Sequence, residues 1–247
     1  MPVNGVPDKA PDRIAGMFDA IAPRYDLLNR VLSAGIDRRW RSRAIASLQL
    51  TGRETLVDVC TGTADVALEG RAGSTAGGNR RAARVIGVDF AGNMLALGRR
   101  KVMAGGESRH IALVRGDAMR LPVRTAGGDA ATMAFGIRNV QDPAAASVEL
   151  ARVLRPGGRL AILEFGLPKI PGVSAAYRWY FSQVLPRVGR LVSGHTAAYS
   201  YLPASVGAFP PPAEFVGVLT RAGFSNVRAI PLTFGIVYLY TGTRADR

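Results

Sequence analysis

DVCTGTADVAL, residues 58–68, places an aspartate at the end of an apolar run, turns through one glycine and continues into a helix-like stretch. A strand, a tight turn and a helix in this order begin many nucleotide-binding α/β sheets. The dinucleotide fingerprint needs three glycines, whereas only Gly62 stands at this turn and Ala64 follows two residues later. The stretch predicts a nucleotide-type turn without identifying the ligand.

Short apolar runs and helix-like stretches alternate along the next hundred residues. Nearly continuous apolar runs of this length are typical of strands buried on both faces of a parallel sheet. Asp142-Pro143 starts one helix, and Pro156-Gly157-Gly158 stops it before the fifth strand. The expected strands are 55–60, 84–89, 111–117, 129–135 and 159–165, and the expected helices are 64–70, 92–103 and 143–154. This alternation predicts a doubly wound α/β sheet.

The pattern changes after residue 165. Residues 174–193 are aromatic and basic with helical spacing, and a helix is expected at 212–222. The last two apolar runs, NVRAIPL and GIVYLYTG, are close enough to pair as an antiparallel hairpin on the sheet edge. Residues 71–84, rich in glycine and arginine, are expected to form an exposed loop. We therefore expect a single domain over residues 14–247 after a flexible N-terminus, residues 1–13.

Composition narrows the class of protein. The chain has 247 residues, 48% of them apolar, no run of 18 uncharged apolar residues and no signal-peptide core. These features predict a soluble, cytoplasmic protein. Its one cysteine, Cys60, excludes an internal disulfide and is expected to be a buried, inert thiol. With only two histidines besides, no metal site is expected.

The net charge of +14 raises nucleic acid as a partner. Only three of the 32 basic residues are lysines, and the arginines are scattered instead of forming a block. That distribution fits a basic solvated surface, or contact with an anionic membrane or an acidic ligand. No RNA-binding appendage is visible, so nucleic acid is not expected as a partner.

Acidic residues fall where the predicted strands end. Ligands of open parallel sheets bind at the carboxyl ends of the strands. Asp89, at the end of the second strand, is placed to accept hydrogen bonds from a ribose diol, although a strand-end aspartate is as often a helix cap or turn former. A single Gly62 favours an adenosine ligand without phosphates, and Asp58 beside the turn suits an ammonium group. S-adenosylmethionine fits these demands.

The chain resembles the menaquinone and ubiquinone biosynthesis C-methyltransferases, a family of class I S-adenosylmethionine-dependent enzymes. The resemblance spans nearly the whole chain after residue 13. FGIRN, combined with APRYDLLN, carries it most specifically, and further matching stretches are VIGVDFAGNML, GDAMRLP, ARVLRPGGRLAILEF and YSYLPASVGAFP. It implies a Rossmann-like sheet of five parallel strands closed by an antiparallel C-terminal hairpin, with N-terminal lid helices.

The resemblance also implies which residues contact the cofactor: Thr63, Asp89, Asp117 and Ala118, with Asp117 facing the adenine amine. The family turn usually has more glycine than this chain, which has Thr61 and Ala64 there. Ala134 stands where the family often has serine, so it offers no side-chain hydrogen bond.

The family reaction methylates a ring carbon of a hydroxylated isoprenoid quinol. For this chain the expected substrate is demethylmenaquinol. The carbon becomes nucleophilic when a neighbouring hydroxyl loses its proton. Arg138 is expected to stabilise that oxyanion, and Asn139 and Tyr25 to orient the ring or relay the proton. A structural salt bridge is the alternative role for Arg138, and core packing the alternative for Tyr25.

The resemblance extends to the substrate side. Residues 14–50 are expected to fold over the cofactor as a lid, and residues 166–211 to cover the substrate. An aromatic stripe is expected to line a tunnel for the isoprenoid tail, to touch the bilayer, or to pack in the core. It comprises Tyr177, Trp179, Tyr180, Phe181, Val184 and Leu185, and His195 is expected near the quinol.

Other functions stay open at this point. The substrate could be a ubiquinone precursor or another small lipid, or the chain could be a non-catalytic cofactor-binding assembly subunit. An RNA methyltransferase is disfavoured because the base-methylating motif is absent. The sequence leaves open a homodimer and peripheral contact with the inner face of the cell membrane.

Overall fold

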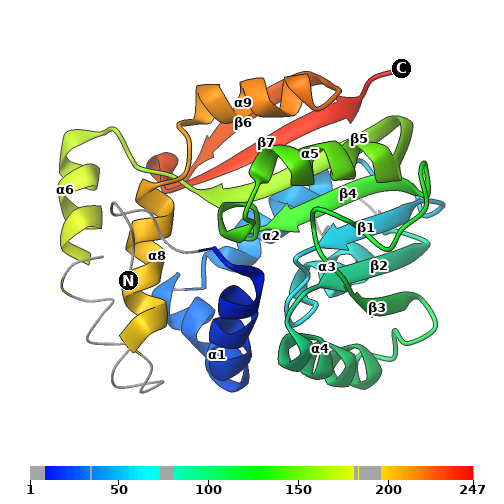
Figure 1. Cartoon of the computed structure of the whole chain (residues 1–247), viewed down its shortest axis with the longest axis horizontal. Helices are drawn as coiled ribbons and strands as arrows, with labels where there is room; N and C mark the ends of the chain where they lie inside the picture. Colours follow the sequence, from blue (N-terminus) through cyan, green and yellow to red (C-terminus); the bar gives the residue numbers. More distant parts are fainter. Residues whose placement is uncertain (1–8, 34, 73–80, 181–182, 184–195, 247) are drawn as a thin grey trace.

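The computed structural model describes residues 9–33, 35–72, 81–180, 183 and 196–246. Within this part of the chain, the strands form one sheet in the order β3-β2-β1-β4-β5-β7-β6 (Figure 1). The strands are β1 (Thr55–Val59), β2 (Arg84–Asp89), β3 (Ile111–Arg115), β4 (Gly128–Ala134), β5 (Leu154–Phe165), β6 (Phe224–Leu232) and β7 (Val237–Arg244). β1 to β5 are parallel, and β7 is antiparallel to β5 and β6. The predicted sheet of five parallel strands closed by an antiparallel hairpin is confirmed.

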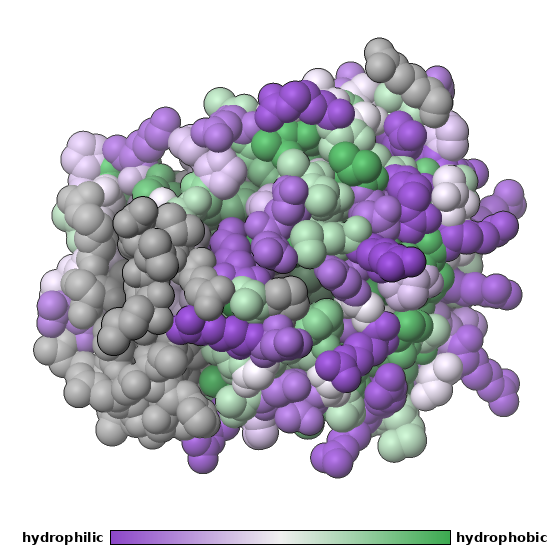
Figure 2. All heavy atoms as spheres, viewed as in Figure 1, coloured by the Kyte–Doolittle hydropathy of each residue, from purple (hydrophilic) through white to green (hydrophobic). Residues whose placement is uncertain are grey.

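Helices cover both faces of this sheet. They are α1 (Pro11–Leu32), α2 (Asp37–Ser47), α3 (Asp65–Ala72), α4 (Gly92–Ala104), α5 (Pro143–Val153), α6 (Pro171–Trp179), α8 (Thr196–Gly207) and α9 (Pro212–Arg221), with short 3₁₀ turns η2 (Ile137–Asn139) and η4 (Thr233–Gly235). α2, α3 and α4 cover one face, whereas α5 and α9 cover the other (Figure 1). α1, α6 and α8 lie beyond the carboxyl ends of the parallel strands. Hydrophilic side chains are spread over the face in Figure 2 with apolar residues between them.

α2 belongs to the hydrophobic core. Its Trp40, Ala44 and Ile45 are buried, together with Leu48 and Leu50 just after the helix, against apolar residues of the sheet. α1 instead packs on α4 and α8. Within the segment 14–50, a lid role therefore stays a prediction for α1 alone, because moving α2 would open the core.

Several boundaries differ from the sequence prediction. α1 begins at Pro11, inside the segment expected to be flexible. β5 begins at Leu154, and its pairing with β4 jumps from Leu154 to Arg159, so Pro156-Gly157-Gly158 forms an irregularity inside the strand. Part of the expected loop 71–84 lies outside the described residues. At its start Arg71 is buried and donates to the Glu107 carboxylate (2.7 Å), whereas Ala72 is exposed as predicted.

The N-terminus of α5 provides a test of the local fold. Asp142 accepts hydrogen bonds from the backbone amides of Ala144 (2.8 Å) and Ala145 (3.1 Å). Asp142→Ala leaves two helix amides without this acceptor, so the free energy of unfolding should fall by about 1 kcal/mol in urea titrations. Asp142→Asn keeps an acceptor and should lose much less. Equal losses in the two variants would contradict the capping role.

Candidate functional site

Two cavities meet beyond the carboxyl ends of the parallel strands. We call the first the strand-end cavity: the ends of β1, β2 and β4, the 116–119 loop, η2 and α1 form its wall. We call the second the aromatic cavity: residues of α1, α2, η2, α6, α8 and η4 form its wall. The aromatic cavity encloses about 400 Å³ and the strand-end cavity about 110 Å³. Phe18, Tyr25 and Phe135 line both, so the cavities share a wall.

The turn after β1 has a strained backbone with left-handed residues. Cys60, Gly62 and Ala64 have φ angles of 53°, 55° and 66°. These left-handed angles suit glycine and strain residues with a Cβ atom. A Cβ atom on Gly62 would meet no protein atom within 4 Å, so this backbone faces open space. The turn can therefore approach a ligand closely at Gly62.

Asp58, in β1, supports the turn through a hydrogen bond from Thr61. It is 1% exposed and lines neither cavity. Its two carboxylate oxygens accept hydrogen bonds from the hydroxyls of Thr61 (2.5 Å) and Thr132 (2.7 Å). Burial raises the pKa of Asp58 to about 6, although these two hydrogen bonds oppose the shift. Asp58 is thus held by hydrogen bonds behind the turn, and the ligand contact expected from the sequence stays a prediction.

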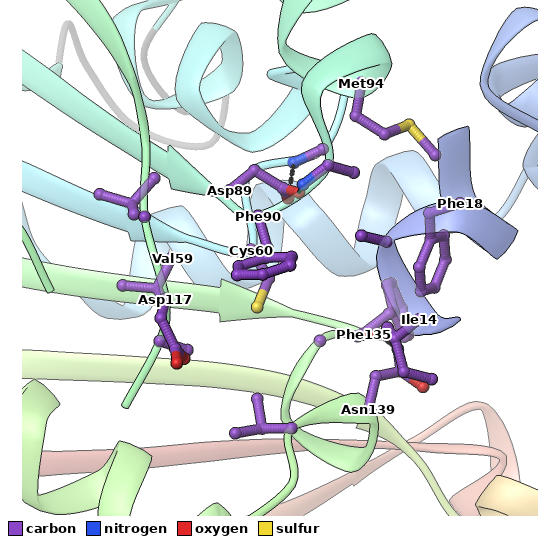
Figure 3. A pocket seen from close by; sticks show the side chains of 18 of the residues that line it. Ile14, Phe18, Val59, Cys60, Asp89, Phe90, Met94, Asp117, Phe135 and Asn139 are labelled. Atoms are coloured by element: carbon purple, nitrogen blue, oxygen red, sulfur yellow. Dashed lines mark hydrogen bonds between the residues drawn. The ribbon is translucent and has the colours of Figure 1, made fainter. Parts of the chain in front are cut away.

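Asp89 reaches the strand-end cavity from the end of β2 (Figure 3). Its carboxylate accepts hydrogen bonds from the amides of Gly62 and Ala91, both at 2.8 Å. Burial raises its pKa, whereas these amide hydrogen bonds lower it. The same carboxylate therefore fixes the turn and forms part of the cavity wall.

The remaining predicted cofactor residues separate into two groups. Asp117 and Ala118 line the strand-end cavity, and the Asp117 side chain accepts from the Met119 amide (2.8 Å). Thr63 is buried and does not line the cavity. Its hydroxyl donates to Asp26 of α1 (2.6 Å) and accepts from Lys101 of α4 (3.1 Å). Thr63 therefore joins the turn to two helices.

The strand-end cavity suits an adenosine ligand with a cationic group. Asp89 and Asp117 provide carboxylates on its wall, and Figure 3 shows them facing the cavity opposite Phe18 and Ile14 of α1. Asn139 also lines it, and its buried Oδ1 has no hydrogen-bond partner among the described residues. A buried acceptor without a partner is costly unless a ligand or water supplies a donor. S-adenosylmethionine carries such donors, so the residues present fit it.

Two smaller residues complete this wall. Ala134 lines the cavity with a methyl group, so the wall lacks a hydroxyl at that position. Cys60 lines it as well and is not fully buried. Burial, then Asp89 and Asp58, raise the pKa of the Cys60 thiol well above its usual value. A protonated thiol is a poor nucleophile, so Cys60 serves as an apolar wall.

The aromatic cavity is largely apolar. Phe135 and Phe165 lie 4.7 Å apart between ring centroids, and Trp40 packs on both. Tyr25 of α1 stands at the wall shared with the strand-end cavity. Burial raises the pKa of its phenol, partly opposed by a hydrogen bond with Asn29. A neutral phenol can donate a hydrogen bond or pack against a ring, so both predicted roles of Tyr25 remain open.

Arg138 lines the aromatic cavity, and one nitrogen of its guanidinium is already hydrogen-bonded within the protein. Its Nη1 donates to the Glu164 carboxylate and to the Phe135 carbonyl, both at 2.7 Å. Glu164 is fully buried, and it also accepts from the Arg138 amide (3.2 Å). The alternative of a structural salt bridge is thus present in the structure. The Arg138 Nε is buried without a partner among the described residues, so one donor stays available.

The structure also brings in residues that the sequence prediction did not name. Glu164 orients Arg138, and Lys101 pairs with Asp26 (2.9 Å) and Asp65 to hold α1 against α3 and α4. The one sequence feature that could have indicated Asp26 is its position directly after Tyr25. Of the predicted aromatic stripe, Tyr177 and Tyr180 line the aromatic cavity, and Trp179 is 61% exposed. Phe181, Val184, Leu185 and His195 lie outside the described residues.

Comparison with known proteins identifies relatives over nearly the full chain. The model of the ubiE/COQ5 methyltransferase family matches residues 7–244. A ubiquinone/menaquinone biosynthesis C-methyltransferase UbiE from Syntrophotalea carbinolica is 49% identical, covering 93% of each chain. A demethylmenaquinone methyltransferase from Deinococcus radiodurans is 45% identical, covering 98% of this chain and 97% of that one. The corresponding enzyme from Thermus thermophilus is 46% identical, covering 92% and 100%.

Solved structures share the fold at low sequence identity. The [4+2]-cyclase SpnF has a TM-score of 0.70 at 17% identity, covering 98% of this chain and 99% of that one. A SAM-dependent methyltransferase from Aquifex aeolicus has a TM-score of 0.53 at 18% identity, covering 82% and 87%. These neighbours include a protein named as a cyclase, so the fold alone does not determine the reaction.

The raised pKa of Asp58 predicts a pH-dependent contribution to stability. The folded protein holds this proton more tightly than the unfolded chain, whose aspartates titrate near about 3.9. Asp58 therefore stabilises the fold fully below about pH 4, and this stabilisation is lost as the pH rises through about 6. Between pH 4.5 and 7.5, wild type should lose roughly 2 kcal/mol of unfolding free energy relative to Asp58→Asn.

Urea titrations at each pH measure this difference. Thr132→Val removes one hydrogen bond to the carboxylate, so it should move the midpoint of the pH effect upward. A difference between wild type and Asp58→Asn that does not vary with pH would overturn the assignment.

Proposed function

Because the chain belongs to the ubiE/COQ5 methyltransferase family, we propose that it methylates a ring carbon of a demethylated isoprenoid quinol. The chain is an S-adenosylmethionine-dependent methyltransferase of quinone biosynthesis. Demethylmenaquinol is the substrate that we propose first, since two relatives of this chain are named as demethylmenaquinone methyltransferases.

One observation carries the proposal: a strand-end cavity and a larger aromatic cavity share the wall formed by Phe18, Tyr25 and Phe135. Methyl transfer needs donor and acceptor in contact and aligned, with water excluded. Two adjoining cavities of different character allow a polar cofactor and an apolar ring to meet at that wall. Phe135 itself has a left-handed φ of 58°, which holds its ring there at the cost of backbone strain.

We propose that Asp89, Asp117, Ala118 and Asn139 hold the cofactor. Asp89 would accept from the ribose hydroxyls and Asp117 from the adenine amine, while Asn139 lines the same cavity with a buried Oδ1 that has no partner among the described residues. When bound, S-adenosylmethionine supplies an electrophilic methyl carbon on a sulfonium. The turn at Gly62 lets the backbone approach it closely, and Ile14 and Phe18 of α1 exclude water from the other side.

The substrate side requires a ring oxygen that becomes an anion. We propose that Arg138 stabilises this oxygen through its Nε, because Glu164 and the Phe135 carbonyl already engage Nη1. An arginine stays protonated, so it favours the phenolate electrostatically and does not remove the proton itself. Tyr25, at the shared wall, is placed to orient the ring.

Two alternatives keep the same cofactor cavity. A demethylated ubiquinone precursor has a smaller ring and also suits an aromatic cavity of about 400 Å³. A non-catalytic assembly subunit would bind the cofactor without turnover. The buried Arg138 Nε, which has no hydrogen-bond partner in the part of the chain that the structure describes, favours an enzyme, because a donor left unpaired is costly unless a ligand supplies an acceptor.

Methyl transfer from labelled S-adenosylmethionine tests the proposal directly. Wild type should convert reduced demethylmenaquinone, with the demethylated ubiquinone precursor assayed in parallel to identify the preferred ring. Arg138→Ala should lower kcat at least about 100-fold, because a preorganised donor to the oxyanion is lost. Cofactor binding without product from either quinol would overturn the proposed activity.

Arg138→Ala also leaves a buried carboxylate unpaired, which by itself destabilises the fold. The double variant Arg138→Ala/Glu164→Gln removes that charge and serves as the control. It should recover thermal stability relative to Arg138→Ala without recovering turnover. Recovery of both would assign Arg138 a structural role only.

We further propose transient contact with an anionic membrane surface. No helix among the described residues is long and apolar enough to cross a membrane. Three apolar residues lie exposed near the aromatic cavity: Leu167, Ile170 and Phe234, the last 69% exposed. Residues 165–213 contain four basic residues and no aspartate or glutamate, in a chain with 18 acidic residues. An apolar patch beside a segment without carboxylates suits an anionic lipid surface.

The backbone holds Phe234 outward. Thr233, Phe234 and Gly235 have consecutive left-handed φ angles of 44°, 58° and 85°. The Trp40 indole donates to the Thr233 hydroxyl (2.9 Å), and Thr233 lines the aromatic cavity. The Gly166 amide donates to the Ile236 carbonyl (2.9 Å), which places Leu167 beside this turn. The exposed residues therefore flank the cavity proposed to hold the lipid substrate.

Phe234→Ser should weaken binding to phosphatidylglycerol vesicles several-fold in co-sedimentation, because it removes the most exposed apolar side chain of the patch. Turnover of a short-tailed, water-soluble quinol should stay unchanged, while turnover of a long-tailed quinol in vesicles should fall. Met103→Ser is the matched control, since Met103 is 70% exposed on α4. Equal effects of both variants on vesicle binding would contradict a specific docking patch.

A further inference from the structure

Tyr201 lines the aromatic cavity and carries a buried hydroxyl that the assigned roles leave unused. It lies on α8 and lines the cavity together with Leu202 of the same helix. Its hydroxyl is buried and has no hydrogen-bond partner among the described residues. A buried hydroxyl without a partner is costly, so its presence needs a reason.

The residues around Tyr201 connect it to Arg138. α8 packs against η2, the turn that carries Arg138. Arg138 and Glu164 are the two charged groups that act on the Tyr201 phenol. The Arg138 Nε is likewise buried and has no hydrogen-bond partner among the described residues, and Arg138 lines the same cavity. Two side chains on neighbouring elements that line this cavity therefore each carry a buried polar group that the described residues leave unpaired.

Both groups can donate a hydrogen bond. The Arg138 Nε–H is a donor only, and the Tyr201 hydroxyl donates as long as it stays protonated. Burial raises the pKa of Tyr201, the positive charge of Arg138 lowers it, and the negative charge of Glu164 raises it again, with burial the largest influence. The phenol is therefore neutral near pH 7 and available as a donor.

We propose that Tyr201 is a second hydrogen-bond donor, beside the Arg138 Nε–H, to the ring oxygen that becomes negatively charged in the substrate. This inference rests on the proposed function and deepens it, because it names a two-donor site for a phenolate. Donors fixed in an apolar cavity stabilise developing charge strongly, since they need no reorganisation. The described residues leave both groups unpaired, and an oxygen ligand at the site would recover the cost of that arrangement.

Other titratable groups border the aromatic cavity and bear on its pH dependence. Asp37 is buried and is paired with Arg41 (2.8 Å) and with the Ser33 hydroxyl (2.8 Å). Burial raises the pKa values of the tyrosines on the other packed elements, so they stay neutral near pH 7. The charged and titratable groups that face the cavity are Tyr25, Asp37, Arg41, Arg138, Tyr177 and Tyr180, with Glu164 behind Arg138.

Tyr201→Phe tests the inference because it removes one oxygen atom and little volume. The variant should lower kcat/KM for the quinol about 10- to 100-fold, the effect of losing one hydrogen bond to a charged group. The acidic limb of the pH profile of kcat/KM should move about one pH unit upward, because the ring hydroxyl of the bound quinol ionises less readily. Affinity for S-adenosylmethionine and thermal stability should not fall, since the hydroxyl has no partner in the free protein. Tyr238→Phe, outside both cavities, is the control for the same chemical change.

A binding measurement separates this inference from the proposed function. 1-Naphthol changes its absorbance on ionisation, so its pKa can be read when it is bound to the protein. Wild type should lower that pKa by about one unit or more, and Tyr201→Phe should reverse much of the shift. Absence of quinol methylation with a lowered naphthol pKa would overturn the substrate but keep the two-donor site. Normal methylation with the same pH profile and naphthol pKa in Tyr201→Phe would overturn the role of Tyr201.

Discussion

Two carboxylates, Asp58 and Asp89, fix the turn between β1 and α3, and the cofactor side of the site depends on them. Asp58 accepts hydrogen bonds from Thr61 and Thr132, and Asp89 accepts one from the Gly62 amide. The turn itself contains alternating left-handed residues, which its own backbone would not favour. The strain is tolerated because the carboxylates hold the turn from the neighbouring strands.

A second buried charge, Glu164, has the same function on the substrate side. It engages one nitrogen of Arg138 and thereby fixes the orientation of the planar guanidinium, whose buried Nε has no hydrogen-bond partner among the described residues. A buried ion pair of this kind adds little stability compared with an apolar pair, so its value lies in orientation. Structural and chemical roles of Arg138 are therefore compatible.

The N-terminal helix connects these two sides. Phe18 and Tyr25 of α1 form part of the wall between the cavities, and Asp26 on the next position binds Thr63 and Lys101. The position of α1 is thus coupled to the cofactor turn through a partly exposed ion cluster. α1 is also held by buried Ile21 and Ala22, which pack on Ala91 and Met94, so its role as a lid stays a prediction.

The sequence by itself determined the order of strands and helices, the hairpin, and the position of Asp89 and Asp117, because strand periodicity and parallel topology bring strand ends to one edge. Tertiary structure alone decided which of the polar residues face a cavity. Asp58, near the end of β1, and Thr63, in the turn, lie close to Gly62 in the chain, yet both are buried and line no cavity, since Thr61 and Thr132 bond Asp58 and Asp26 and Lys101 bond Thr63. Glu164 and Tyr201 gave no local signal, because their role depends on partners, or the lack of them, on elements far away in the chain.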